Sequence, residues 1–295
     1  IPPSRNHMNT LDYIVIALYL GLSLLMGCRL GARQVNTEQY FLSGRSMKWL
    51  PVAIALFAAL FSSISYIAMP GEAYNYGCTM LVSSLPGIIA LPVMLFVFLR
   101  FFYDMKLWTI NEYLALVAIL VVGVASTIYT YFGGMDAVIW TDVMQFVVLF
   151  GGILLVIGVV AWELPGGVGG IWQTAVDNHR TFNFGAQSGF WDLSMTERIT
   201  VWPMLIGLPW ALFMPACDQI NLQRCMTCKN FMEVVRAICW SSLSNPFICF
   251  VFYFAGLAVF AYYNVLHPGM IPAGTGGDDA FCMFVSHELP AGVRG

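Results

Sequence analysis

Charged residues are scarce in this sequence. Asp, Glu, Lys and Arg make up 10% of the 295 residues, and 59% of the residues are hydrophobic. Soluble domains carry about 25% charged residues, so this composition excludes a soluble globular protein and indicates a membrane protein. The apolar runs are long and continuous rather than alternating, which predicts spanning helices instead of a barrel. The net charge is −3 and there is no basic stripe, so no nucleic-acid partner is expected.

The sequence also lacks the residue clusters that most catalytic and metal sites need. It has no set of nucleophile, base and orienting residue, and no glycine-rich phosphate loop. Ser62 and Ser63 have no His or Lys near them in the sequence, so an intramembrane hydrolase is kept only as an alternative function. The CxxC motif formed by Cys225 and Cys228 has no second CxxC or His pair. We interpret it as a loop thiol pair that stays reduced on the cytoplasmic side.

Seven apolar runs are long enough to cross a bilayer as helices. They cover residues 11–30, 51–74, 78–99, 114–132, 137–161, 201–220 and 237–263. We therefore predict that residues 1–295 form a single all-helical domain in the lipid bilayer of the plasma membrane. Arg and Lys gather in loops 31–49 and 100–110, and positively charged loops favour the cytoplasmic side.

A third basic loop, at residues 221–236, conflicts with this count. Five crossings separate it from loop 31–49, which would place the two loops on opposite sides of the membrane. Both loops face the cytoplasm if one crossing has been lost between Lys106 and Leu114. Alternatively, the third loop tolerates the unfavourable side, because the charge bias is a tendency. We favour the loss of a crossing.

One apolar run is interrupted by polar residues and helix breakers. Residues 58–77 read AALFSSISYIAMPGEAYNYG, with three serines, a Pro-Gly pair and Glu72. A break in a membrane helix is tolerated inside protein or beside a wet cavity, and such breaks coordinate cations and small solutes. We predict a discontinuous helix over 51–74, with Glu72 as a candidate cap for its second half. The alternative is a helix that ends at Tyr66, followed by an ordinary turn over 69–77.

Several segments together resemble the sodium:solute symporter family. They are TEQYFLSGRSM at 37–47, YFGGMDAVIWTDVMQ at 131–145, and the pairs Asp218–Gln219 and Gln223–Arg224. The PGEAY segment at 70–74 is most similar to the iodide, monocarboxylate and multivitamin branch. The resemblance implies a LeuT-like, all-α transmembrane fold of two inverted five-helix repeats, with one extra N-terminal helix. It also implies that one span is missing near residue 114 and that the second repeat is truncated in this chain.

The resemblance assigns ion-binding roles as well. The backbone carbonyls of Ala58 and Phe61 correspond to half of a sodium site, whose hydroxyl ligands would lie beyond the end of the chain. Asp142 corresponds to an acid on the path by which sodium leaves, and the alternative is an interfacial capping acid. Asp218 has the same two interpretations, because Arg224 is near enough in sequence to pair with it. Sodium is the transported ion, and no other metal or cofactor is expected.

The clustered serines Ser62, Ser63 and Ser65 are candidate solute contacts. The resemblance implies contacts at Ser65, Ser84, Gly87, Ala211 and Met214. The alternative role for the three clustered serines is close packing between helices. Where sugar carriers have hydrogen-bonding and gating groups, this chain has small or apolar residues, and each buried polar group left unpaired costs free energy. A sugar is therefore disfavoured, and a small anion or organic acid, held by hydroxyls and helix N-termini, is preferred.

These observations together predict sodium-coupled symport of a small solute, and not an enzyme. Because half of the sodium site would lie outside residues 1–295, we expect this chain to be inactive alone and to bind no sodium specifically. The alternative is a non-transporting remnant that assembles with other membrane proteins.

Overall fold

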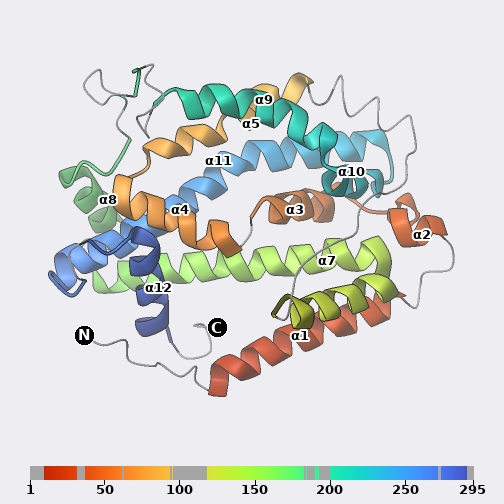
Figure 1. Ribbon diagram of the computed structural model, residues 1–295, viewed down its shortest axis with the longest axis horizontal. Coiled ribbons are helices and arrows are strands. Elements are labelled where there is room, and N and C mark those ends of the chain that lie inside the picture. Colours follow the sequence, from red (N-terminus) through yellow and green to blue (C-terminus); the bar gives the residue numbers. More distant parts are fainter. Residues whose placement is uncertain are drawn as a thin grey trace.

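The described part of the chain is built from helices. The computed structural model describes residues 10–31, 37–61, 63–93, 95, 118–182, 184, 190–192, 200–271 and 274–290. Within these ranges there is no β-strand, and Met47 and Cys228 form an isolated bridge. Figure 1 shows the helices gathered in one bundle, with α11 and the long α7 running through it.

The helices are connected by short segments in most of the described chain. Their bounds are α1 (Thr10–Gly31), α2 (Thr37–Leu42), α3 (Trp49–Leu60), α4 (Ser63–Tyr76), α5 (Pro86–Val93), α7 (Ala118–Glu163), α8 (Gly167–Asp177), α9 (Trp202–Cys217), α10 (Gln219–Met226), α11 (Phe231–Ala261) and α12 (Gly277–His287). The 3-10 turns η1 (Ser43–Arg45) and η2 (Thr79–Ser84) precede α3 and α5, and a π turn (Tyr262–Leu266) follows α11.

Three apolar helices among the described residues are long enough to cross a membrane. They are Thr10–Leu30, Gly133–Glu163 and Phe231–Leu266. The helices Trp49–Ala59 and Thr79–Val93 are apolar but shorter. The long helices contain the runs expected at 11–30, 137–161 and 237–263, whereas the runs at 51–74, 78–99 and 201–220 are divided or shorter. Residues 100–110, Lys106 and Leu114 lie outside the described residues.

The helix over residues 51–74 is discontinuous, and its break lies at the serines. Helix α3 ends at Leu60, and Phe61 has extended backbone angles (φ −102°, ψ 103°). Helix α4 then runs from Ser63 to Tyr76 and passes through Pro70. The turn considered for residues 69–77 is therefore wrong, because those residues up to Tyr76 are helical. Glu72 lies well inside α4 rather than in its first turn, so it cannot cap that helix.

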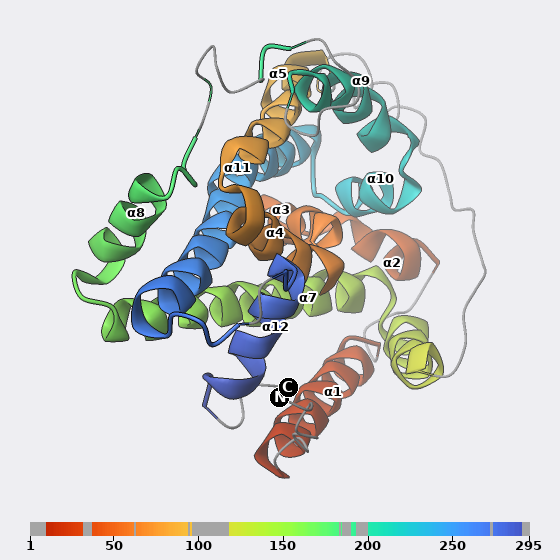
Figure 2. The same cartoon turned by 60° about the vertical axis from the view of Figure 1, so that its left-hand side comes forward.

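The Pro-Gly pair serves the packing of α4 instead of breaking it. A Cβ atom on Gly256 of α11 would clash with the carbonyl oxygen of Pro70, and one on Gly277 of α12 would clash with that of Gly71. Figure 2 shows one end of α12 set against α4, with α11 on the other side. Glycine at these positions lets three helices approach to backbone contact, and α4 is thereby held between α11 and α12.

Helix α7 consists of two segments that meet at a glycine pair. Gly134 has φ 55° and ψ −153°, which lies in the region open to glycine, and the chain changes direction there (Figure 1). A Cβ atom on Gly133 would lie 2.9 Å from the carbonyl oxygen of Gly27, and one on Gly134 would lie 2.5 Å from that of Tyr40. The bend separates the predicted runs 114–132 and 137–161.

A second discontinuous helix is formed by α9 and α10. Helix α9 runs without a break from Trp202 to Cys217, so the three prolines in it do not divide the predicted run at 201–220. The interruption comes at Asp218, which has extended backbone angles and caps α10 with its side chain. Among the described residues, extended backbone thus interrupts a helix near Phe61 and again at Asp218.

The two basic loops that the crossing count separates lie side by side. The amide of Met47 donates a hydrogen bond to the carbonyl of Thr227 (3.2 Å), and the amide of Lys229 donates to the carbonyl of Met47 (3.1 Å). Residues 45–48 and 224–236 bring Arg and Lys to this place, which we call the basic end. Because adjacent loops cannot face opposite sides of a membrane, five alternating crossings do not describe this fold.

The directions of the helices at the basic end explain why the number of membrane crossings between the two loops is not five. Leu91 and Leu95, at the end of α5 and just beyond it, pack against the same apolar cluster as Met47. The first segment of α7 also ends at the basic end, because Gly134 lies beside Tyr40. Two successive described helices thus run toward one end, as expected if one crossing between them is absent.

The close contact between α4 and α11 should be sensitive to a single methyl group. We expect Gly256→Ala to lower the free energy of unfolding by about 1–3 kcal/mol, because the backbone of Pro70 has no room to move away. Thermal unfolding in detergent, followed by tryptophan fluorescence, would measure the change.

A matched control is Gly158→Ala in α7, where nothing lies within 4 Å of the added Cβ atom. Alanine favours helix over glycine by about 1 kcal/mol, so this variant should be as stable as the parent or slightly more. Equal unfolding temperatures for the Gly256→Ala variant and the parent would contradict the assigned contact.

Candidate functional site

The candidate sodium ligands lie at the end of α3. The carbonyl oxygen of Ala58 accepts a hydrogen bond from the amide of Phe61 at 3.2 Å. A carbonyl oxygen has two lone pairs, so this bond leaves Ala58 able to coordinate a cation. Phe61 follows the last residue of α3 and has extended backbone angles. Its carbonyl therefore lies outside the regular hydrogen-bond pattern of that helix. The geometry suits coordination at the break, and the sodium half-site remains a prediction.

Aromatic rings line one side of the break between α3 and α4. Phe61 is 9% exposed, and its ring stacks on Phe57 with a centroid distance of 4.8 Å. Phe252 of α11 lies 5.1 Å from Phe61, and Phe146 of α7 lies 5.7 Å from Phe57. These rings exclude water from one side of the break. An ion at Ala58 and Phe61 would therefore lose part of its hydration there and would need oxygens to replace it.

The three serines after the break stay candidate solute contacts. Ser62 lies outside the described residues. Ser63 is the first residue of α4, where only its backbone is described, and Ser65 lies half-buried one half-turn further along. Helix α4 begins at these serines, and the partial positive charge of a helix N-terminus favours an anion or a polar group of a solute.

The other expected solute contacts lie on neighbouring elements. Helix α9 packs on η2 and α5, where a Cβ atom on Gly207 would lie 3.1 Å from the ring of Pro86. Ser84 ends η2, and its hydroxyl donates to the carbonyl of Leu81 at 2.7 Å. Gly87 follows in α5, and Ala211 lies one turn after Gly207 in α9. Met214 also belongs to α9, where only its backbone is described. The structure thus brings the η2–α5 and α9 positions together, whereas Ser65 lies on α4 beside α11 and α12.

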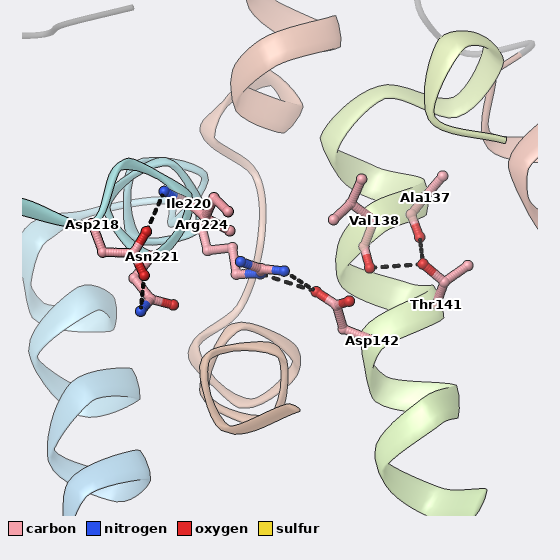
Figure 3. Close-up of polar contacts among 8 residues, drawn as sticks. All are labelled: Ala137, Val138, Thr141, Asp142, Asp218, Ile220, Asn221 and Arg224. Carbon is pink, nitrogen blue, oxygen red and sulfur yellow. Dashed lines mark hydrogen bonds and ion pairs between the residues drawn. The ribbon is translucent and has the colours of Figure 1, made fainter. Parts of the chain in front are cut away.

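An ion pair crosses from α7 to α10 near the basic end. Arg224 donates hydrogen bonds through Nε (2.9 Å) and Nη2 (2.7 Å) to Oδ2 of Asp142, as Figure 3 shows. The two side chains are 7% and 13% exposed, so solvent screens this pair little. Asp142 is therefore a paired acid between two helices. Its predicted place on the sodium exit path remains a prediction, since a paired acid at the helix interface fits the packing equally well.

Asp218 has a structural role and does not bind Arg224. Its Oδ1 accepts from the amide of Ile220 at 3.0 Å, and its Oδ2 accepts from the side chain of Asn221 at 2.8 Å (Figure 3). This is the arrangement of an N-cap, which satisfies the free amides at the start of α10. The pairing of Asp218 with Arg224 suggested by their sequence separation is therefore wrong.

A cavity of about 310 Å³ adjoins the ion pair at the basic end. It is bounded by α2, by the bend of α7 and by α10, and its lining residues include Tyr40, Gly134, Gln223 and Arg224. Gln223 donates a weak hydrogen bond to the carbonyl of Phe41 at 3.4 Å, which ties α10 to α2. The cavity thus lies between elements that Arg224 and Gln223 connect.

The CxxC thiols are buried at the basic end rather than displayed in a loop. Cys225 is 3% exposed and Cys228 is fully buried. Burial raises the pKa of the Cys228 thiol to about 12 and also raises the pKa of Cys225. Both residues are free thiols, as expected. Within the part of the chain that the structure describes, no group of three His, Cys, Asp or Glu residues is placed to hold a metal ion.

Two charged residues that bind the ends of other helices were missed by the sequence analysis. Arg180 donates to the carbonyl of Tyr74 at the end of α4, and its guanidinium lies 4.1 Å from the ring centroid of Phe260. Glu233 accepts a hydrogen bond from the amide of Trp49, the first residue of α3, at 2.9 Å. Neither contact is local in sequence, and only the Asn-x-x-Glu pattern before α11 could have drawn attention to Glu233.

Comparison with known proteins supports the resemblance over nearly the whole chain. The model described as "Sodium:solute symporter family" matches residues 40–117 and 116–295. A sodium/sialic acid symporter, SiaT of Proteus mirabilis, is 25% identical over 97% of this chain and 65% of its own length. The human sodium/iodide cotransporter is 26% identical over 87% of this chain and 46% of its own length. The chain thus spans about two thirds or less of these relatives.

A solved structure has the same fold. It is the substrate-bound, outward-open state of a Na⁺-coupled sialic acid symporter, with a TM-score of 0.85 and 22% identity. The superposition covers 97% of this chain and 68% of that one. The LeuT-like fold expected from the resemblance is confirmed. The alignment with SiaT has 328 positions, whereas 97% of 295 residues is about 286, so about 40 positions are filled by the relative alone. That number is enough for a missing helix of about 20 residues and its loops.

Removal of one partner of the buried ion pair should destabilise the fold. We expect Arg224→Ala to lower the free energy of unfolding by about 3–5 kcal/mol, because the carboxylate of Asp142 is left buried without its cation. The double variant Asp142→Asn, Arg224→Gln should recover much of this loss. The control is Arg236→Ala, whose guanidinium is 58% exposed and should contribute about 1 kcal/mol or less. Similar unfolding temperatures for the two single variants would refute the pairing.

The buried thiols should be inert in the folded protein. Because their pKa values are raised, Cys225 and Cys228 stay protonated at pH 8, and the reactive thiolate of Cys228 appears only as the pH approaches about 12. We expect maleimide, with labelled peptides quantified by mass spectrometry, to modify the exposed Cys282 first and the CxxC pair only after denaturation. Equal rates for Cys282 and Cys228 in native protein would show that the pair is accessible.

Proposed function

Because this chain belongs to the sodium:solute symporter family, we propose that the whole protein couples the entry of Na⁺ to the uptake of a small anion or organic acid. The observation that carries the proposal is the helix broken at Phe61, together with a second helix broken at Asp218. Discontinuous helices near the middle of the bundle supply carbonyls for cations and N-termini for anions. The similar proteins are transporters and not enzymes, so the hydrolase alternative has no support from them.

The sodium site of the proposal begins with Ala58 and Phe61. Their carbonyls lie where α3 ends, and the rings of Phe57 and Phe252 keep water from one side. Na⁺ needs several oxygens to replace its hydration shell, and two carbonyls are too few. The proposal therefore needs further oxygen ligands besides these two carbonyls.

The solute site of the proposal lies around the start of α4. The candidate contacts are Ser62, Ser63, Ser65, Ser84, Gly87, Ala211 and Met214. The N-terminus of α4 is a favourable place for a negative charge, because the start of a helix carries a partial positive charge. The hydroxyl of Ser84 already donates within its own turn, so it offers a solute an acceptor oxygen rather than a donor. The helix N-terminus therefore favours an organic anion over a neutral polyol, whereas the acceptor oxygen of Ser84 would bind a donor group elsewhere on the solute.

We further propose that the basic end faces the cytoplasm of a cell whose plasma membrane holds the protein. Loops 43–49 and 224–236 meet there, and both carry Arg and Lys. Asp142 lies between the sodium half-site and this end, which suits an acid on the exit path of the ion. The single membrane domain and its seven expected runs remain part of the proposal.

Uptake by proteoliposomes that contain the whole protein is the direct test. Radiolabelled iodide, a short monocarboxylate and sialic acid form the panel, because relatives are named for iodide, monocarboxylate and sialic acid transport. We expect at least one solute to accumulate with an inward Na⁺ gradient and to stop when K⁺ or choline replaces Na⁺. Equal uptake in K⁺ would end the sodium-coupled interpretation, and no uptake of any solute would favour the non-transporting alternative.

The half-site can be tested by the bulk of one side chain. We expect Ala58→Phe to raise the Na⁺ concentration for half-maximal uptake at least about tenfold, because the larger side chain displaces the carbonyls at the end of α3. The control is Ala59→Phe, since Ala59 is exposed and points away from the packed side of α3. Equal Na⁺ dependence in the two variants would remove Ala58 from the site.

A further inference from the structure

The carboxylate of Glu233 binds a helix other than its own. Helix α11 begins with Asn230, whose side chain accepts a hydrogen bond from the amide of Glu233 at 2.9 Å. In an Asn-x-x-Glu pattern the acid is expected to turn back and bind the first residues of its own helix. Here its Oε2 accepts a hydrogen bond from the amide of Trp49, the first residue of α3, at 2.9 Å. One carboxylate therefore stands at the N-termini of two helices.

This position is electrostatically favourable for a negative charge. The free amides of α3 and α11 give both helix starts a partial positive charge. Lys48, which precedes α3, makes no side-chain cap of its own to that helix. The second oxygen of Glu233 pairs with Arg236 at 2.9 Å, but that guanidinium is 58% exposed while Glu233 is 16% exposed. The bond to Trp49 is thus the more buried of the two contacts.

The two halves of the broken helix are held in different ways. Helix α4 is in backbone contact with α11 and α12 through Gly256 and Gly277. The start of α3 packs through Val52 and Ala53 in the buried cluster of the basic end. Hydrogen bonds add to this packing, from Trp49 to Glu233 and between Met47 and the 227–229 segment. The extended backbone at Phe61 separates the halves, so the start of α3 can move without dragging α4.

We propose that Glu233 is a positioning residue for transport, and that its bond to the Trp49 amide latches the start of α3 and keeps the basic end closed. Release of this latch opens the path between the half-site at Ala58 and the basic end. The proposal rests on the proposed function, since it assigns a gate to the transporter. Glu233 contacts neither ion nor solute; it acts through α3.

A buried cysteine reports on the latch without any need for transport. Ala53 lies on α3 and is fully buried in the cluster near the basic end. The experiment introduces Ala53→Cys into the whole protein after its other cysteines have been replaced. A membrane-impermeant thiol reagent is then added on the side of the basic end. We expect Glu233→Ala to speed labelling at least about tenfold, because a hydrogen bond to a charged group is lost. Arg236→Ala should leave the rate within about twofold.

A backbone substitution isolates the bond itself. Proline is well tolerated as the first residue of a helix, and Lys48 already has the extended angles that precede a proline (φ −80°, ψ 158°). Trp49→Pro removes the amide donor and the indole, whereas Trp49→Ala removes only the indole, which packs near Trp240. We expect labelling of the Trp49→Pro variant to be about tenfold faster than that of Trp49→Ala. Adding Glu233→Ala should then change the Trp49→Ala variant and leave the Trp49→Pro variant unchanged.

The outcomes separate the latch from the proposed function. Equal labelling of the Trp49→Pro and Trp49→Ala variants, or additive effects of Glu233→Ala in both, would overturn the latch even if sodium-driven uptake is found. Faster labelling in protein that transports none of the tested solutes would support the latch while the proposed function fails. If Glu233→Ala does not yield a folded, monodisperse protein, the comparison at Trp49 decides alone.

Discussion

The structure depends on satisfying the free backbone groups of helix ends inside a largely apolar bundle. Each helix leaves unpaired amides at its start and unpaired carbonyls at its end, and a membrane offers no water to pair them. The described breaks are met by specific side chains. Asp218 caps α10 and Asn230 caps α11. Glu233 of α11 accepts a hydrogen bond from the first amide of α3. Arg180 covers the end of α4.

The helix ends at the break between α3 and α4 are candidates for binding ions. Helix α3 has ended at Phe61, and α4 begins at Ser63, so carbonyls of one helix end and amides of a helix start occur within a few residues. Unpaired carbonyls attract a cation, and unpaired amides attract an anion, so one interruption can present both polarities. The proposed sites for Na⁺ and for an organic anion are placed at this interruption for that reason.

The two halves of the broken helix differ in the contacts that hold them. Glycines at 71, 256 and 277 bring α4 into backbone contact with its neighbours, and such contacts tolerate little displacement. The start of α3 packs in the apolar cluster of the basic end and is also held by hydrogen bonds near Met47 and Glu233. The ion pair of Asp142 and Arg224 joins α7 to α10 at the same end. The basic end therefore contains several polar contacts that can exchange together.

Much of the fold could be predicted from the sequence, because long apolar runs leave few alternatives in a membrane. The runs at 11–30, 137–161 and 237–263, the break after Phe61 and the bend at Gly133–Gly134 follow from local composition. The motifs at 37–47 and 131–145 identified the family. The half-site at Ala58 and Phe61 could be located only by that resemblance, and the serines and α9 positions were candidates without a shared geometry.

Tertiary structure alone decided which polar residues meet. The sequence suggested that Glu72 caps α4 and that Asp218 binds Arg224, because both pairs of groups are close along the chain. In the fold, α4 continues through Pro70, and Arg224 reaches Asp142, 82 residues away. Likewise, Glu233 binds Trp49 across 184 positions instead of its own helix start. Hydrophobic periodicity fixes where helices form, but the partner of a buried charge depends on how those helices pack, and that arrangement is set by contacts distant in sequence.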